Sequence, residues 1–185
     1  QMESEVRQTL AEFPGVALLV SHDRGEVYRM SGRVCVLNTG VAEPVCATRD
    51  LFERPRTLQA ALISGCKNCV SAEILETGYV RVPGWNATLA CGEAAGRRVS
   101  HIGIRAHDVG LCEPGAENAL CCRVLDVSED VFSSVLTLQP LGGAETIRAE
   151  LSKSAAQGLA AGGEAWFCLP ARAVMLLSET HDGKI

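Results

Sequence analysis

Aromatic side chains are scarce in this sequence of 185 residues, and both a basic surplus and a long apolar run are missing. Phe, Trp and Tyr make up 4% of the residues, so the core that a 47% hydrophobic content predicts must be mainly aliphatic. The formal net charge of −5 argues against a general nucleic-acid-binding surface, which needs a basic face. No apolar run approaches the ~18 residues of a membrane span, so we expect any membrane association to come through a partner.

Cysteine is the exception to this scarcity, with nine residues and a single CxxC motif, Cys66–Cys69. Most of the others, such as Cys168, lie in apolar runs where a thiol packs as a small hydrophobe. The odd number and this placement predict reduced thiols in a cytosolic protein without a disulfide framework. Zinc needs four ligands, and no second CxxC or histidine pair is present, so no metal site is expected. The alternative, that Cys66 and Cys69 form half of a metal or redox site, stays open.

Residues 1–13 have the apolar spacing of an amphipathic helix, and Pro14-Gly15 is expected to end it. The unbroken apolar run 16–20 is typical of a strand buried in a parallel sheet. The polar triplet Ser21-His22-Asp23 follows directly, where open α/β sheets place functional groups. A histidine there can donate a hydrogen bond to a terminal phosphate. The alternative is an ordinary loop histidine after a core strand.

Short helices and a hairpin are predicted between this triplet and residue 65. Asn38-Thr39-Gly40 is the turn signal of the hairpin, and Thr57 is a typical residue to cap a helix. The predicted elements are a helix over 24–30, a hairpin of strands 33–37 and 41–46, a helical turn over 48–52 that Thr48 caps, and a helix over 58–63 that Gly65 ends.

The pattern changes near residue 64, after which short alternating runs with Gly-rich turns predict a small barrel or sandwich. In the run 146–151, Ile147, Ala149 and Leu151 are expected to face the core. A weak twofold echo relates 66–110 to 118–177 but is too faint to identify a repeat. The remaining predicted elements are strands over 119–127, 131–138 and 165–169 and a short helix over 153–158.

The N-terminal third resembles the end of the ATPase domain of ABC transporters. The resemblance rests on the segments Ala17–Asp23, Glu26–Arg29, Arg33–Gly40 and Leu51–Pro55. It implies that His22 is the switch histidine that touches the γ-phosphate of ATP in a complete domain whose parent protein uses ATP and Mg²⁺. The sequence has no GxxxxGK[ST] loop, no LSGGQ-like signature and no acidic Walker B strand end. The chain alone is therefore expected to be an inactive fragment that holds no cofactor.

The remainder resembles the TOBE accessory domains of importer ATPases and, within them, the molybdate-binding Mop module. Gly103–Asp108 is similar to a Gly-Ile-Arg-Pro-Glu-type element, and Ser64–Asn68 is similar to the first strand of such domains. This resemblance implies an OB-like barrel. We therefore expect an α+β protein, with a truncated α/β remnant of an ATPase domain over 1–65 and an all-β barrel domain over 66–185. The Mop-like pieces are Asn118–Leu120, Gly142-Gly143, Ala149–Ser154 and Val174–Leu177.

The candidate ligand site is the triplet Ser152, Lys153 and Ser154, where a strand is predicted to pass into a short helix. Two hydroxyls, an ammonium and free backbone N–H groups at a helix start favour an oxyanion. The alternative is a serine cap beside a solvated lysine. Mop modules carry an arginine near the anion, whereas the matching position here is Glu117, whose negative charge would repel an oxyanion.

Together these resemblances imply the regulatory C-terminal part of an ABC importer ATPase subunit for molybdate, tungstate or sulfate. Its partners would be a second ATPase subunit in a homodimer, the transmembrane permease and an oxyanion ligand, with no nucleic acid. The protein would lie in the cytoplasm against the inner face of the membrane. The alternative is a free-standing oxyanion-binding module with an N-terminal extension, but such a module has no use for a strand that ends in Ser-His-Asp.

Overall fold

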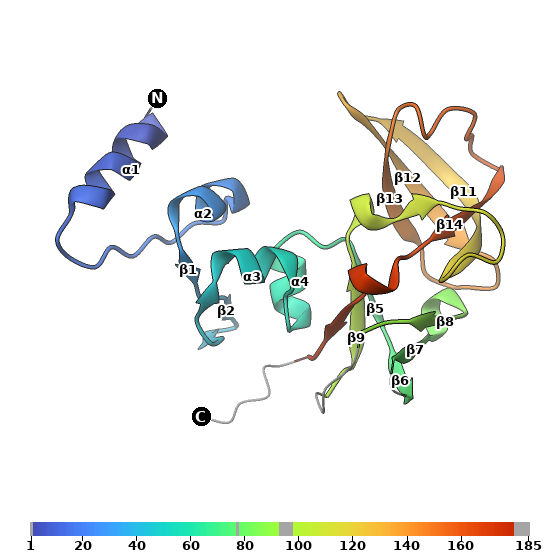
Figure 1. Ribbon diagram of the computed structural model, residues 1–185, viewed down its shortest axis with the longest axis horizontal. Helices are drawn as coiled ribbons and strands as arrows, with labels where there is room; N and C mark the ends of the chain where they lie inside the picture. Colours follow the sequence, from blue (N-terminus) through green and yellow to red (C-terminus); the bar gives the residue numbers. More distant parts are fainter. Residues whose placement is uncertain (1, 77, 93–97, 180–185) are drawn as a thin grey trace. The chain divides into compact units, whose positions relative to one another are not determined.

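The computed structural model describes residues 2–76, 78–92 and 98–179, and the chain divides between Arg54 and Pro55 into two compact units (Figure 1). We refer to residues 1–54 as unit 1 and to residues 55–185 as unit 2. The division precedes the expected boundary at 65/66 because helix α4 (Leu58–Ile63) packs within unit 2. Ala61 of this helix shares a buried cluster with Leu177, and the Leu58 N–H donates to the Ser178 carbonyl over 2.9 Å.

Unit 1 contains three helices and two small antiparallel strand pairs among its described residues. Strands β2 and β3 form the predicted hairpin, and the positive φ angles of Thr39 (47°) and Gly40 (83°) close its turn. Tyr28 packs edge-on against Phe52, with ring centroids 5.3 Å apart. The elements are α1 (Met2–Glu12), α2 (Arg24–Met30), β1 (Arg33–Val34), β2 (Leu37–Asn38), β3 (Val41–Ala42), β4 (Cys46–Ala47) and α3 (Thr48–Glu53).

Two predictions for unit 1 are wrong. Residues 16–20 form no strand, and Val16 and Leu18 are 96% and 91% exposed. A parallel strand needs hydrogen-bonded neighbours on a sheet, and no described strand pairs with this run. Thr48 is the first residue of α3 and not its cap, because its hydroxyl donates to the Ser31 carbonyl over 2.6 Å.

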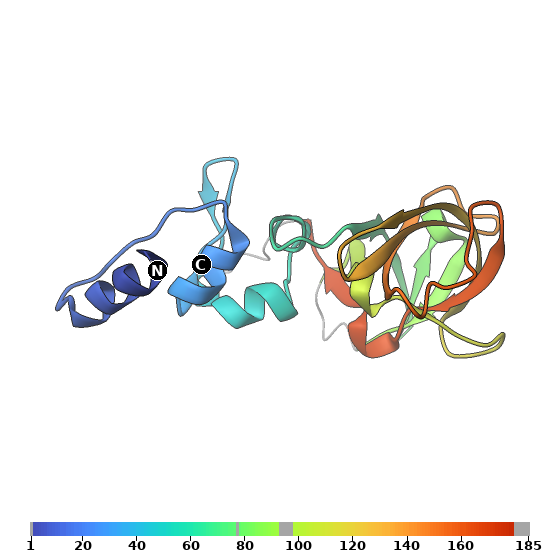
Figure 2. The same cartoon turned by 90° about the horizontal axis from the view of Figure 1, so that it is seen from above.

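Unit 2 consists of strands and short 3₁₀ turns after α4, and Figure 2 shows its strands curving around a common centre. The strands run in three sheets with the orders β15-β9-β5, β6-β7-β8 and β10-β14-β11-β12-β13. Their bounds are β5 (Asn68–Ser71), β6 (Glu73–Glu76), β7 (Tyr79–Val82), β8 (Ala87–Ala90), β9 (His101–Ile104), β10 (Gly110–Leu111), β11 (Ala119–Glu129), β12 (Ser133–Pro140), β13 (Ile147–Ser152), β14 (Glu164–Cys168) and β15 (Met175–Leu177), with 3₁₀ turns η1 (Pro83–Trp85), η2 (Ala106–Asp108) and η3 (Ala171–Ala173).

The sheets of unit 2 form an internal repeat of two halves that exchange their last strands. In the first half, β9 lies between β5 and β15; in the second half, β14 lies between β11 and β10. Each half therefore contributes its last strand to the sheet of the other half. The 3₁₀ turns η2 and η3 precede these exchanged strands at matching places. The faint echo in the sequence is thus a structural repeat.

One continuous apolar core joins the three sheets of unit 2. The alternation in β13 is as predicted, because Ile147, Ala149 and Leu151 are buried and the residues between them are exposed. Residues 153–158 form turns and not the predicted helix. The chain is thus mostly β with few helices, an α+β protein with a barrel-like second unit. No helix in the described part of the chain is both long and apolar enough to cross a membrane.

Candidate functional site

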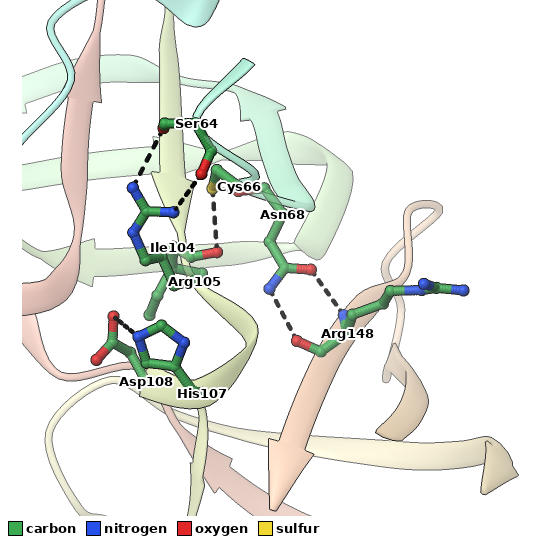
Figure 3. Close-up of polar contacts among 8 residues, drawn as sticks. All are labelled: Ser64, Cys66, Asn68, Ile104, Arg105, His107, Asp108 and Arg148. Carbon is green, nitrogen blue, oxygen red and sulfur yellow. Dashed lines mark hydrogen bonds and ion pairs between the residues drawn. The ribbon is translucent and has the colours of Figure 1, made fainter. Parts of the chain in front are cut away.

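Two buried or half-buried asparagines hold the halves of unit 2 together in the same way. The Asn68 amide donates to the Arg148 carbonyl over 2.8 Å and accepts from the Arg148 N–H over 2.7 Å. Arg148 lies on β13, the last strand of its sheet, so the amide occupies the place of a further strand at that edge. Figure 3 shows this paired contact.

Asn118 repeats the contact at the other half. Its amide accepts from the Ala90 N–H over 2.7 Å and donates to the Ala90 carbonyl over 2.8 Å, and β8 is likewise an edge strand. A further bond runs from the Asn118 amide to the Leu169 carbonyl over 2.8 Å. The φ of 54° at Asn118 is one that asparagine tolerates better than most residues. We call Asn68 and Asn118 the two amide clamps.

Beside the first clamp, Arg105 joins the Gly103–Asp108 element to the start of β5. Its guanidinium donates to the carbonyl and the hydroxyl oxygen of Ser64, both over 3.2 Å. His107 is exposed and lies 4.0 Å from the Asp108 carboxylate. Figure 3 shows Arg105, Ser64 and Asn68 around the chain segment that leads into β5. Arg105 and His107 therefore have structural contacts at this junction.

A shallow cleft of about 370 Å³ opens next to the same clamp. The indole nitrogen of Trp85 is buried and has no hydrogen-bond partner among the described residues. The lining contains one cation, Lys67, and one carboxylate, Glu145, so its formal charges balance. The lining residues are Lys67, Asn68, Cys69, Val70, Trp85, Ala144, Glu145 and Thr146.

His22 lies in unit 1, exposed, in the loop before α2. Its two neighbours organise the start of that helix: Asp23 accepts from the Glu26 N–H over 2.8 Å, and the Ser21 hydroxyl donates to the Glu26 carboxylate. The Glu26 N–H lowers the pKa of the Asp23 carboxyl below its ordinary value. Ser21 and Asp23 thus cap the start of α2, and the catalytic function of His22 stays a prediction.

Ser152, Lys153 and Ser154 come together at the end of β13, all of them exposed. The Ser152 hydroxyl accepts from the Ala155 N–H over 3.2 Å and lies 3.0 Å from the Ser154 hydroxyl. The Lys153 ammonium lies 3.5 Å from the Glu129 carboxylate. Each polar group of the triplet therefore already has a partner that an oxyanion would have to displace or share.

The amide clamps were missed in the sequence. The signal was available, because Asn68 is the first residue of β5 and Asn118 directly precedes β11, at matching places of the two halves. Treating the twofold echo as a repeat would have aligned the two asparagines. Trp85 carried no comparable signal, since a single aromatic residue in a turn does not indicate a cleft.

No family model matches the chain. Its curated relatives are ATP-binding subunits of ABC importers. It is 31% identical to the spermidine/putrescine import ATP-binding protein PotA 1 of Pseudomonas aeruginosa, over 66% of this chain and 35% of that protein. It is 28% identical to the Fe(3+) ions import ATP-binding protein FbpC 1 of Pectobacterium atrosepticum, over 65% of this chain and 34% of the relative. The chain thus spans about a third of the length of these relatives.

Among solved structures, the chain is similar to the cytoplasmic molybdate-binding protein ModG, solved with molybdate bound. The match covers 60% of this chain and 96% of ModG, with a TM-score of 0.50 and 20% sequence identity. At this identity the similarity concerns the fold alone. The sequence relatives are thus importer ATP-binding subunits, and the fold is shared with a molybdate-binding protein.

Proposed function

We propose that this chain is the C-terminal part of the ATP-binding subunit of an ABC importer, with unit 2 as its regulatory domain. The observation that carries the proposal is the set of sequence relatives, which are import ATP-binding proteins. A barrel-like unit with the fold of a small-ligand-binding protein supports a regulatory function for unit 2. The free-standing oxyanion-binding module is the second candidate, and the fold of unit 2 favours it equally.

Residues 1–65 would then complete an ATPase domain in the parent protein. ATP and Mg²⁺ would bind to the phosphate loop and Walker B residues of that parent, which this sequence lacks. The exposed run 16–20 would pair with the strands of the complete sheet. His22 would then donate to the γ-phosphate at the end of that strand.

ATP turnover by the parent subunit tests the proposal. In the parent, His22→Ala should lower kcat by about 100-fold or more, as the loss of one donor to a transition-state charge does. His107→Ala, which also removes an exposed histidine, should leave kcat unchanged. The 185-residue chain alone should show no Mg²⁺-dependent turnover. Turnover by the chain alone, or an unchanged kcat in His22→Ala, would contradict the proposal.

For the transported solute we propose an oxyanion such as molybdate, tungstate or sulfate, bound with the help of Ser152, Lys153 and Ser154. The two relatives described above are named for polyamines and iron, and neither name indicates molybdate, tungstate or sulfate, so the solute class rests on the triplet and on the fold. Calorimetric titration with the three anions tests it. Lys153→Gln should weaken binding, whereas Arg123→Gln should not, because Arg123 is an exposed cation in a similar ion pair, 3.1 Å from Glu164. Equal affinities of the two variants would refute a function of the triplet.

The partners follow from the proposed subunit. We propose a homodimer of ATP-binding subunits that docks on the transmembrane permease, at the inner face of the cell membrane. For the 185-residue chain alone, the exposed apolar side chains of 16–20 also favour association, since exposed aliphatic surface of this kind is rare on a monomer. Co-purification of the tagged parent subunit with its permease from detergent-solubilised membranes would support this placement, and recovery of the subunit without any membrane component would argue against it.

A further inference from the structure

The two cysteines of the CxxC motif, for which the sequence left a metal or redox site open, lie together in unit 2. Cys66 lies between α4 and β5 and is 2% exposed, and Cys69 is the second residue of β5 and is half-buried. Cys69 packs against the buried cluster that contains Cys66. The Cys66 sulfur also lies 3.3 Å from the Ile104 carbonyl and 3.4 Å from the Asn68 carbonyl. Figure 3 shows the Cys66 contact with Ile104.

A glycine on the neighbouring strand makes room for this pair. Gly103 lies directly opposite Cys69 in the β5–β9 pairing. A Cβ atom at Gly103 would lie 3.3 Å from the Cys66 sulfur, 3.2 Å from the Met175 methyl and 3.1 Å from a Leu177 methyl. The missing side chain therefore lets the Cys66 sulfur lie against the backbone of β9, within reach of Cys69.

The surroundings make the two thiols chemically unequal. The pKa of Cys66 lies below its ordinary value, first because the Cys69 side chain hydrogen-bonds to it and also because the Arg105 guanidinium is near. The same hydrogen bond, together with burial, raises the pKa of Cys69. This difference favours Cys66 as the sulfur that ionises and attacks, and Cys69 as the thiol that resolves the product.

We propose that Cys66 and Cys69 form an oxidisable dithiol site that closes to a disulfide when it reacts with a hydroperoxide. The Cys66 thiolate attacks the peroxide oxygen, which gives a sulfenic acid and releases water once the leaving hydroxide takes a proton. The Cys69 sulfur then attacks the sulfenic sulfur, loses its proton and expels a second water. In sum, two thiols are oxidised and one hydrogen peroxide is reduced to two waters. Burial of Cys66 restricts the first step to a small oxidant.

A disulfide between Cys66 and Cys69 would restrain the segment that joins α4 to β5. The Cys66 N–H donates to the Ala61 carbonyl over 2.9 Å and so ends α4, and the Cys66 side chain packs with Ala61 and Leu177. A disulfide would tie the end of α4 to β5 through a loop of four residues, Cys66–Cys69. The amide protons at the end of α4 should therefore change their exchange rates on oxidation. The inference does not depend on the proposed importer function.

A second cysteine pair in the same unit provides the internal control. Cys112 and Cys168 also share a side-chain contact, but the pKa of Cys112 is raised to about 11, first by burial and then by Cys168 and Glu113. Among the described residues, Cys112 has no neighbouring cation that lowers its pKa, whereas Cys66 has Arg105. The Cys112–Cys168 pair should be oxidised more slowly.

The test is limited oxidation of the full chain with hydrogen peroxide at pH 7.5, followed by alkylation, digestion with trypsin and mass spectrometry. Trypsin cleaves after Lys67, so a Cys66–Cys69 disulfide leaves two peptides joined. We expect this product to form at least about tenfold faster than a Cys112–Cys168 disulfide. Cys69→Ser should stop at a sulfenic acid on Cys66, which dimedone traps when the oxidised chain is unfolded in its presence. Arg105→Gln, with native fluorescence, should slow the reaction.

Three outcomes would overturn the proposal. One is that Cys112 and Cys168 join first. Another is that the Cys66–Cys69 disulfide appears only in urea, where the fold no longer holds the sulfurs together. The last is a rate in Arg105→Gln equal to that of the unmodified sequence while its fluorescence stays native. Formation of the disulfide in the folded chain, at the expected relative rate, would support it.

Discussion

Asn68→Ala should destabilise unit 2 by about 2–3 kcal/mol. The substitution removes two hydrogen bonds of 2.7 and 2.8 Å from a side chain that is 3% exposed. A net hydrogen bond contributes about 1 kcal/mol, and a buried group left without a partner costs about 1–3 kcal/mol. Because water can partly reach the freed edge of β13, we expect the loss of stability to lie near the lower end of the range that these values give together.

The assay is urea unfolding followed by tryptophan fluorescence. Both tryptophans, Trp85 and Trp166, lie in unit 2, so the signal reports this unit alone. With a slope of about 1–3 kcal/mol per molar urea, the midpoint should fall by roughly 1–2 M. Asn68→Asp is the matched variant: it keeps the acceptor for the Arg148 N–H but turns the donor into a second acceptor facing the Arg148 carbonyl.

The second clamp supplies an independent comparison. Asn118→Ala removes three hydrogen bonds and also places alanine at a φ of 54°, which costs roughly 1–2 kcal/mol more. Asn118→Gly should therefore be less destabilising than Asn118→Ala. If Asn68→Ala shifts the free energy of unfolding by less than about 0.5 kcal/mol, the two edge contacts do not hold the halves together, and the reasoning fails.

Three further predictions concern unit 1 and the assembly. Hydrogen exchange should be faster at 16–20 than at 133–138, because the first run has no strand partner and the second lies in an antiparallel pair; the reverse order would contradict the structure. Asp23 has a lowered pKa, so its capping of α2 should persist at neutral pH and be lost as the pH falls through that pKa. An NMR titration should show the Glu26 amide signal shifting in acid, and Asp23→Asn should abolish this shift. Sedimentation should show that the chain is a dimer, and a monomeric full chain would refute this prediction. Deletion of residues 1–62 then tells whether unit 1 or unit 2 forms the dimer contact.

The spacing of apolar residues predicted most strands of unit 2, because the alternation of buried and exposed side chains is visible within each strand's own sequence. The alternation at Ile147, Ala149 and Leu151 is visible in the sequence and reappears as buried positions. The cap at Thr57 was also predictable, since its hydroxyl accepts from the Ala60 N–H three residues on, over 3.1 Å. Short-range chemistry of this kind needs no knowledge of the fold.

The errors arose where the outcome depends on distant partners. An apolar run such as 16–20 predicts a buried strand only if other strands flank it, and the described residues provide none. Thr48 has the right residue type for a cap, but its hydroxyl donates a hydrogen bond to the carbonyl of Ser31, which lies outside α3 and earlier in the chain. The contact between Asn68 and Arg148 joins residues of different halves, so no local pattern could reveal it.

The exchange of terminal strands between the halves of unit 2 has a consequence for how the chain folds during synthesis. The sheet β15-β9-β5 is complete only when Met175–Leu177 has joined it, although β5 begins more than a hundred positions earlier in the numbering. Such nonlocal pairing must wait for loop closure over most of the unit. The first half therefore cannot finish folding while the ribosome still holds the second, and a chain that stops between β14 and β15 would leave β9 without one of its two strand partners.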